Sequence, residues 1–163
     1  MKENKTNAMR LLERAEAPYT AHAYPHEDGA IDAVAVAGKL GQDPRRVFKT
    51  LVTQGHSRAY YVFVIPAPCE LDLKAAARAV GEKSVEMIPV KDINKVSGYI
   101  RGGCSPIGMK KAYPTVFDQS ATEHETLYVS AGRIGLQIEA APDTLIALSK
   151  AKTASICHKL TKL

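Results

Sequence analysis

The chain has 163 residues, 45% of them hydrophobic and 24% charged, which is the length and composition of one ordinary globular domain. Its 11 glycines and 9 prolines are too few for a collagen-like or linker sequence. The longest apolar stretch, residues 60–68, is far shorter than the roughly 20 residues of a membrane span, and residues 1–10 lack the apolar segment of a secretory signal. We therefore expect a single domain over residues 1–163, located in the cytoplasm, with no membrane as a partner.

The 22 basic and 17 acidic residues give a net charge of +5, which mildly favours a polyanionic partner. The basic residues gather in three places. Each group alone is typical of a solvated face. On a small domain, however, the three groups together are equally well interpreted as a surface that contacts a nucleic-acid backbone. The groups are Arg45, Arg46 and Lys49; Lys110 and Lys111; and Lys150, Lys152, His158, Lys159 and Lys162.

Five segments have the apolar spacing and terminal residues of helices. They are residues 7–15, 31–40, 71–80, 90–96 and 142–148. Thr6 or Asn7 can cap the first of them, and Gly41 and Gly81 can end the second and third. The third is the clearest, with Leu71, Leu73, Ala75, Ala76, Ala79 and Val80 along one side.

Seven segments are predicted as strands, because they are rich in β-branched and aromatic residues or alternate in polarity. They are residues 19–24, 47–53, 59–65, 84–87, 115–118, 127–130 and 136–140. The second and third are separated by turn-forming residues, which predicts a hairpin. Strands outnumber helices and many connections are too short for parallel crossovers. We therefore expect an α+β fold, a single domain with a curved mixed β-sheet flanked by helices.

The loop of residues 102–111 contains Gly103 and Gly108 at the spacing of a phosphate-binding Walker loop. Met109 stands where that motif needs lysine, and Pro106 removes one amide donor, which excludes an NTPase loop. Two interpretations stay open. The loop is either a tight turn with two exposed lysines or a segment whose backbone amides approach a ligand closely.

No residue pattern in the chain predicts a metal ion, a cofactor or a nucleophile of the protein's own. The five histidines do not form a His-Glu-x-x-His pattern, and Cys69, Cys104 and Cys157 do not form a Cys-x-x-Cys pair. The three cysteines are expected to be reduced thiols. There is no Gly-x-Ser-x-Gly elbow.

Lys49 is the most unusual charged residue, because strand alternation places it on the same face as Val47 and Leu51. A lysine among apolar neighbours either extends its ammonium to solvent at a strand end or directs it into a cleft. Removing an ammonium from water is costly unless an anion or a dipole meets it.

Four segments together resemble the YbaK/EbsC family of Cys-tRNA(Pro) and Cys-tRNA(Cys) deacylases, relatives of the editing domain of bacterial prolyl-tRNA synthetases. The resemblance covers residues 8–148 in the same order and with similar spacing. The segments are Leu40-Gly41-x-x-Pro44-x-x-Val47-x-Lys49-Thr50-Leu51, Leu71-Asp72-Leu73-Lys74, Gly98-Tyr99 with Gly102-Gly103-x-Ser105-Pro106-x-Gly108-x-Lys110-Lys111, and Tyr128-Val129-Ser130-x-Gly132-Arg133-x-Gly135-Leu136.

The resemblance implies an enzyme that edits in trans. Prolyl-tRNA synthetase attaches cysteine to its tRNA by mistake, because a pocket for proline rejects a similarly small side chain weakly. The family cleaves the resulting ester, and its members are proposed to use the thiol of the substrate cysteine as the attacking group. The implied partners are the aminoacylated 3′ end of tRNA and prolyl-tRNA synthetase. Two alternatives remain: hydrolysis of Ala-tRNA(Pro) by a positioned water, and a non-catalytic module that binds tRNA or the synthetase.

The resemblance also assigns site residues. Lys49 corresponds to the lysine that holds the aminoacylated 3′ end, and Gly102 and Gly103 to the pair whose amides meet the developing oxyanion. The predicted substrate-binding residues are Tyr24, Lys49, Ser105, Ser130 and Gln137. Two departures from the family pattern put in question the shape of the pocket, and with it the preference for cysteine over alanine as the amino acid removed. Gln137 stands where relatives often carry an acidic residue, and the loop around residues 30–32 is shorter than in some relatives.

Overall fold

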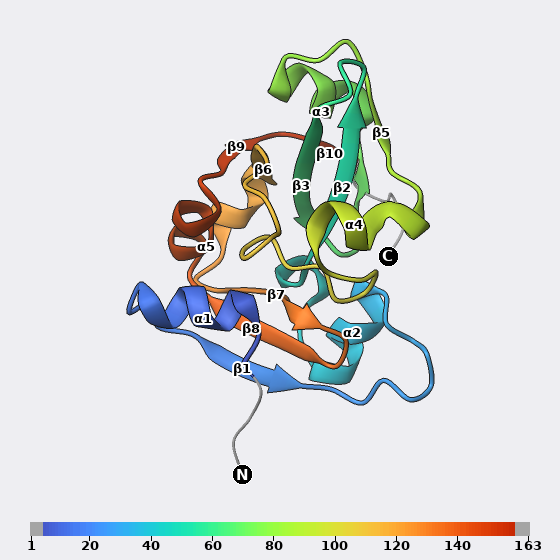
Figure 1. The fold of residues 1–163 in the computed structure, drawn as a ribbon. Helices are drawn as coiled ribbons and strands as arrows, with labels where there is room; N and C mark the ends of the chain where they lie inside the picture. The colour runs from blue at the N-terminus through green and yellow to red at the C-terminus, as the bar shows by residue number, and fades with distance from the viewer. Residues whose placement is uncertain (1–4, 159–163) are drawn as a thin grey trace.

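The backbone forms two sheets that lie edge to edge and share a core (Figure 1). The computed structural model describes residues 5–158. The larger sheet has the order β5-β2-β3-β6-β9, with the β2–β3 hairpin antiparallel and β6 and β9 parallel to their neighbours. Its strands are β2 (Phe48–Gly55), β3 (Tyr60–Pro66), β5 (Val85–Met87), β6 (Thr115–Asp118) and β9 (Lys152–Ala154).

The smaller sheet is antiparallel, with the order β1-β8-β7. It consists of β1 (Thr20–Ala23), β7 (Leu127–Arg133) and β8 (Leu136–Ala140). A parallel bridge between Val47 and Tyr128 connects it to the start of β2. The α+β class and the mixed sheet expected from the sequence are therefore confirmed, with the strands divided between two ladders. A further two-stranded ladder joins β4 (Glu70–Leu71) to β10 (Cys157–His158).

The helices begin and end where local capping groups allow. They are α1 (Asn7–Arg14), α2 (Ala33–Leu40), α3 (Leu73–Val80), α4 (Ile93–Ser97) and α5 (Pro142–Ser149), with 3-10 turns at Pro44–Arg46, Val90–Asp92 and Gln119–Glu123. Asp32 caps α2 by accepting from the N–H of Ala35 at 3.0 Å, and Gly41 ends it in the left-handed conformation. None of the described helices is long and apolar enough to cross a membrane.

The structure corrects the prediction for the third helix. Leu71 belongs to β4, and the helix begins at Leu73 because Asp72 accepts from the N–H of Ala75 at 3.1 Å as its N-cap. Leu73 is exposed, and the buried face of α3 consists of Ala76 and Ala77. The sequence prediction also missed β4, β9 and β10, which are short and become strands only by pairing with distant segments.

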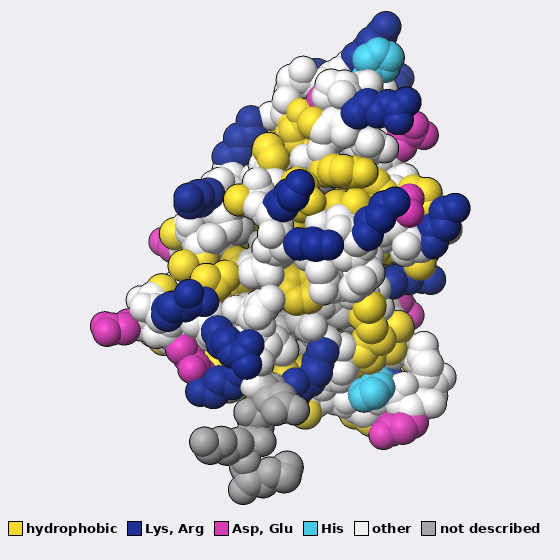
Figure 2. All heavy atoms as spheres, in the orientation of Figure 1, with side chains coloured by type: hydrophobic (Ala, Val, Ile, Leu, Met, Phe, Trp, Pro, Cys, Tyr) yellow, Lys and Arg dark blue, Asp and Glu magenta, His cyan; other side chains and the backbone are white. Residues whose placement is uncertain are grey.

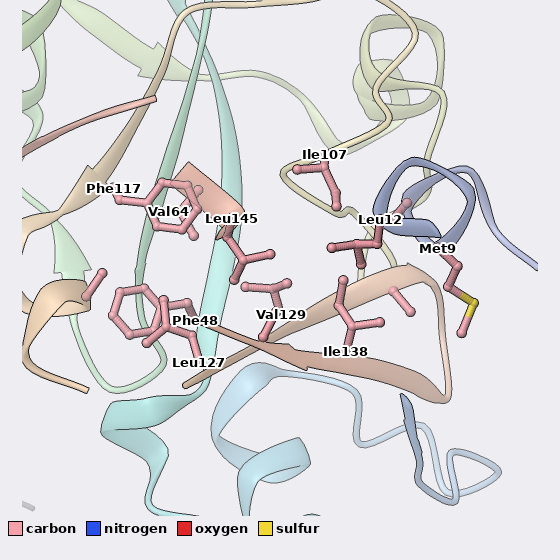
Figure 3. Close-up of a cluster of buried hydrophobic side chains, with 14 of the residues drawn as sticks. Met9, Leu12, Phe48, Val64, Ile107, Phe117, Leu127, Val129, Ile138 and Leu145 are labelled. Carbon is pink, nitrogen blue, oxygen red and sulfur yellow. The ribbon is translucent and has the colours of Figure 1, made fainter. Parts of the chain in front are cut away.

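The main core lies between the two sheets and is closed by α1 and α5 (Figure 3). Phe48, Val64 and Phe117 come from the larger sheet, and Leu127, Val129 and Ile138 from the smaller one. Met9 and Leu12 of α1, Leu145 of α5 and Ile107 of the loop complete it. One face of the smaller sheet is thereby buried, and its other face is directed toward α2.

We expect the change Ile138→Ala to lower the free energy of unfolding by about 2–5 kcal/mol, because it leaves a cavity in this shared core. Ile138 is fully buried, whereas Leu73 is 45% exposed. The change Leu73→Ala should stay within about 0.5 kcal/mol of the parent protein. Urea unfolding of both variants measures the difference, and equal losses would contradict this description of the core.

Candidate active site

The face of the smaller sheet that is turned away from the core is polar. In the ladder, His22 is paired with Gln137, and Gln137 with Ser130. Tyr24 lies two residues beyond His22, on the same side, and its N–H donates to the carbonyl of Gly135 at 3.0 Å. Three of the predicted pocket residues, Tyr24, Ser130 and Gln137, are therefore brought together by adjacent strands, and all three are buried.

Lys49 lies beside this polar face. The parallel bridge joins Val47 to Tyr128, and two residues further along the two strands are Lys49 and Ser130. The side chain of Lys49 is half-buried, and its Nζ donates to the carbonyl of Ala67 at 3.0 Å. Within residues 5–158 the ammonium has no ion-pair partner, and it keeps donors for another group.

Burial lowers the pKa of Lys49 below its usual range, because the charged form has lost part of its hydration. Nearby acidic groups, including Glu70 and Asp32, oppose this effect. An anion placed against the ammonium would restore the interaction energy that burial removes.

The glycine pair connects the loop of residues 98–111 to the same region. A Cβ atom at Gly102 would lie 2.6 Å from Cδ1 of Ile31, next to Asp32 at the start of α2. A Cβ atom at Gly103 would lie 3.0 Å from backbone atoms of Arg133 and Ile134, in the turn between β7 and β8. Both glycines therefore allow the loop to pack closely on two segments that border the polar face.

The two amides of the pair are not equivalent. The N–H of Gly103 donates to the carbonyl of Ile100 at 2.9 Å, which closes a turn in which Gly102 has a φ of 85°. Within residues 5–158, the N–H of Gly102 has no hydrogen-bond acceptor. Of the predicted pair, Gly102 is thus the residue whose amide is not used by the described part of the fold, and the catalytic role of both stays a prediction.

Three buried polar side-chain atoms have no hydrogen-bond partner in the described part of the chain. They are Oη of Tyr24, Oγ1 of Thr50 and Oε1 of Gln137. Leaving such an atom unpaired costs about 1–3 kcal/mol, so each requires an explanation. Two of the three belong to predicted substrate-binding residues and the third follows Lys49 in β2. A polar ligand that meets Tyr24 and Gln137 would explain two of the three.

Thr50 was missed as a candidate, although it stands in the segment with Lys49 that carries the family resemblance. Ser105 has a different environment from the other candidates. It is fully buried within the loop, where its hydroxyl accepts from the N–H of Ile107 at 3.5 Å. This hydrogen bond supports the turn, and a role of Ser105 in substrate binding stays a prediction.

The three basic residues grouped in the sequence at positions 45–49 do not form one surface. Arg45 pairs with Asp43, with 2.7 Å between Nη2 and Oδ2. Arg46 lies over the ring of Tyr128, 5.2 Å from its centroid, and also contacts Glu139. Arg45 and Arg46 thus have acidic partners within the fold, whereas Lys49 donates to a backbone carbonyl.

Two of the three cysteines, Cys104 and Cys157, are poorly suited to attack an ester. Burial raises the pKa of the Cys104 thiol to about 11. Burial, helped by Asp118 and Cys69, raises the pKa of Cys157 strongly, and Cys69 itself is buried. Thiols with raised pKa values are protonated near neutral pH and are weak nucleophiles. Among the described residues, no three His, Cys, Asp or Glu side chains are arranged to hold a metal ion.

Residues 27–148 match the family described as the aminoacyl-tRNA editing domain. The chain belongs to this family. It is 45% identical over 157 residues, covering 96% of both chains, to an Enterococcus faecalis protein named "Putative Cys-tRNA(Pro)/Cys-tRNA(Cys) deacylase EbsC". The resemblance to the YbaK/EbsC family that the four segments predicted is thereby confirmed.

Solved structures of editing-domain size share the fold. One, described as "hypothetical protein APE2540", has a TM-score of 0.85 at 18% identity and covers 94% of this chain and 100% of that chain. Another, described as "a putative trans-editing enzyme for prolyl tRNA synthetase", has a TM-score of 0.81 at 22% identity and covers 96% of this chain and 99% of that chain. At these identities the likeness establishes the editing-domain fold.

We expect the change Gly103→Ala to destabilise the protein by about 1–3 kcal/mol, because the added methyl group meets backbone atoms that cannot rotate away. The matched control is Gly38→Ala in α2, where an added Cβ meets no atom within 4 Å. That change should stabilise the protein by about 0.5–1 kcal/mol, since alanine favours a helix interior. Thermal unfolding measures both, and a neutral Gly103→Ala would contradict the close approach of the loop.

Proposed function

We propose that the protein is an aminoacyl-tRNA deacylase that removes cysteine from Cys-tRNA(Pro), acting in trans. Membership of the editing-domain family supports deacylation of aminoacyl-tRNA. The name of the Enterococcus faecalis relative, at 45% identity over nearly the whole chain, supports cysteine as the amino acid removed.

The observation that carries the proposal is the composition of the site: a half-buried ammonium beside unpartnered polar atoms. The ammonium of Lys49 suits a phosphate of the tRNA 3′ end. Tyr24 and Gln137 offer hydrogen-bonding atoms that the terminal adenosine and the aminoacyl group can satisfy. Such a site can bind and orient an ester so that a group of the substrate itself attacks it.

The attacking group is then the thiolate of the substrate cysteine. Its sulfur attacks the carbonyl carbon of its own ester, a C–S bond forms, and the C–O bond to the terminal ribose breaks. The departing ribose oxygen takes a proton from water, and the resulting thiolactone is later opened by water to free cysteine. The N–H of Gly102 is the donor that we assign to the developing oxyanion.

Orientation can supply a large part of the rate. A well-placed intramolecular attack is worth up to about 7–11 kcal/mol, although the strain of a four-membered ring reduces this gain. A thiol with a pKa of about 8.5 is already a few per cent ionised at pH 7. Selection then follows from chemistry, because an amino acid without a thiol cannot react in this way.

We further propose that prolyl-tRNA synthetase is the partner that directs the enzyme to tRNA(Pro). A net charge of +5 is small for independent recognition of a whole tRNA. One solved structure with the same fold is described as a putative trans-editing enzyme for prolyl tRNA synthetase, which supports the choice of partner.

The first test compares Cys-tRNA(Pro), Ala-tRNA(Pro) and Ser-tRNA(Pro) as substrates of the purified protein. We expect kcat/KM for the cysteinyl ester to exceed the others by about 100-fold or more, the range that a missing catalytic group produces. Equal rates for the cysteinyl and alanyl esters would show attack by water and reject the thiol mechanism. Absence of turnover with all three would leave a binding module.

The second test uses the pH dependence of deacylation, after subtraction of the rate without enzyme. We expect the rate to rise as the substrate thiol ionises and then to fall when Lys49 loses its proton, below the usual lysine pKa of 10.5. In Lys49→Arg the falling limb should move to higher pH, because a guanidinium stays charged above pH 12. Lys49→Met should lose activity at every pH.

The matched control is Lys83, an exposed lysine away from the site. Lys83→Arg and Lys83→Met should keep the parent profile. If the falling limb does not move in Lys49→Arg, Lys49 is not the group that titrates.

A further inference from the structure

A basic surface lies next to the candidate site. The segment of residues 90–112 contains five basic residues and one acidic residue, Asp92. All five basic side chains are exposed, and we call them the basic face: Lys91, Lys95, Arg101, Lys110 and Lys111. Figure 2 shows Lys and Arg side chains spread over the side of the molecule that carries α4, with acidic side chains mostly at its margins.

The charges of the basic face are only weakly neutralised by the protein. Lys95 lies 3.5 Å from Asp92 and its side chain is 72% exposed. Three basic residues elsewhere have closer partners: Lys5 lies 2.7 Å from Glu13, Lys39 lies 2.8 Å from Asp28, and Arg45 lies 2.7 Å from Asp43. Exposed like charges that lack nearby acids repel one another, and a polyanion relieves that repulsion.

The segment is held in one arrangement by hydrogen bonds across its base. The N–H of Lys110 donates to the carbonyl of Ser97 at 2.9 Å, and Oη of Tyr113 donates to the carbonyl of Val96 at 2.7 Å. The Nζ of Lys110 donates to the carbonyl of Lys95 at 3.2 Å, which brings two basic residues of the face together. The ammonium groups are therefore placed on a fixed backbone.

The same segment forms the border of the site. Arg101 directly precedes Gly102, which packs on Ile31, and Gly103 packs on the turn between β7 and β8. A tRNA whose 3′ terminus lies at Lys49 must continue outward past the border of the site. The basic face is continuous with that border.

We propose that the basic face binds the phosphate backbone of the tRNA acceptor arm while the aminoacylated 3′ end occupies the site. This inference rests on the proposed function. Phosphate contacts supply affinity without reading the base sequence. The basic face would thus hold any tRNA, and the choice of tRNA(Pro) would be made elsewhere.

The test is a triple variant, Lys95→Gln/Arg101→Gln/Lys111→Gln, with affinity for uncharged tRNA measured at several salt concentrations. We expect tRNA binding about tenfold weaker or more, and a slope of log K against log salt that is smaller by about 2–3, since each lost duplex contact removes about 0.9. Turnover of a short cysteinylated CCA oligonucleotide should stay within about twofold of the parent protein, because the basic face does not touch the ester.

The matched control removes three exposed positive charges around α3, in Lys74→Gln/Arg78→Gln/Lys83→Gln. Lys74 and Arg78 line a hollow of about 520 Å³ there, together with His158 and Asp72. This control should bind tRNA like the parent protein. An equal loss in both triple variants would mean a general effect of net charge and would overturn the proposal.

Two further outcomes also overturn it: unchanged tRNA binding in the first variant, and loss of binding to prolyl-tRNA synthetase with tRNA binding intact. Thermal unfolding verifies that both variants are folded. Failure of the proposed function can be distinguished from failure of this inference. In the first case the parent protein would cleave neither Cys-tRNA nor the cysteinylated oligonucleotide, while the salt dependence of its tRNA binding could still be measured.

Discussion

The packing of the two sheets against one shared core determines where chemistry can take place in this molecule. Phe48 and Phe117 on one side and Val129 and Ile138 on the other exclude water from the space between the sheets. Side chains alternate along a strand, so burying one face of the smaller sheet directs Ser130 and Gln137 to the opposite face. The bridge from Val47 to Tyr128 then places the start of β2, and with it Lys49, beside those polar groups.

The resulting site is arranged for binding and orientation. In the proposed function, Lys49 is the positive charge with reduced hydration and the N–H of Gly102 is the donor for the developing oxyanion. The protein's own thiols are buried or have raised pKa values. Under the proposed mechanism, only a substrate with its own thiol can react, which is a stricter criterion than a pocket can apply to side chains of similar size.

Local signals in the sequence predicted the parts of the fold that depend on neighbouring residues. Asp32 and Gly41 delimit α2 as expected, and the turn formers between residues 53 and 59 produce the β2–β3 hairpin. Strands β9 and β10 were missed because their hydrogen-bond partners lie in β6 and β4, far away in sequence, and their own residues do not favour a strand.

The candidate site was predictable to a similar extent. The family resemblance indicated Ser130 and Gln137, which face each other in the β7–β8 ladder, and the roles of these residues, Tyr24 and Lys49 in substrate binding stay predictions. The separation of Arg46 from Lys49 could not be foreseen, because it depends on Tyr128 and Glu139, some 80 to 90 residues away. The different uses of the two glycine amides depend likewise on a turn that composition does not specify.

The unpartnered hydroxyl and amide oxygens of Tyr24, Thr50 and Gln137 have a consequence for how the protein can change. Each lowers the stability of the free protein, and under the proposed function a bound substrate would offset that loss at Tyr24 and Gln137. A library of variants selected for heat resistance alone would drift toward phenylalanine, valine and leucine at these positions. It would gain robustness and lose turnover as it did so.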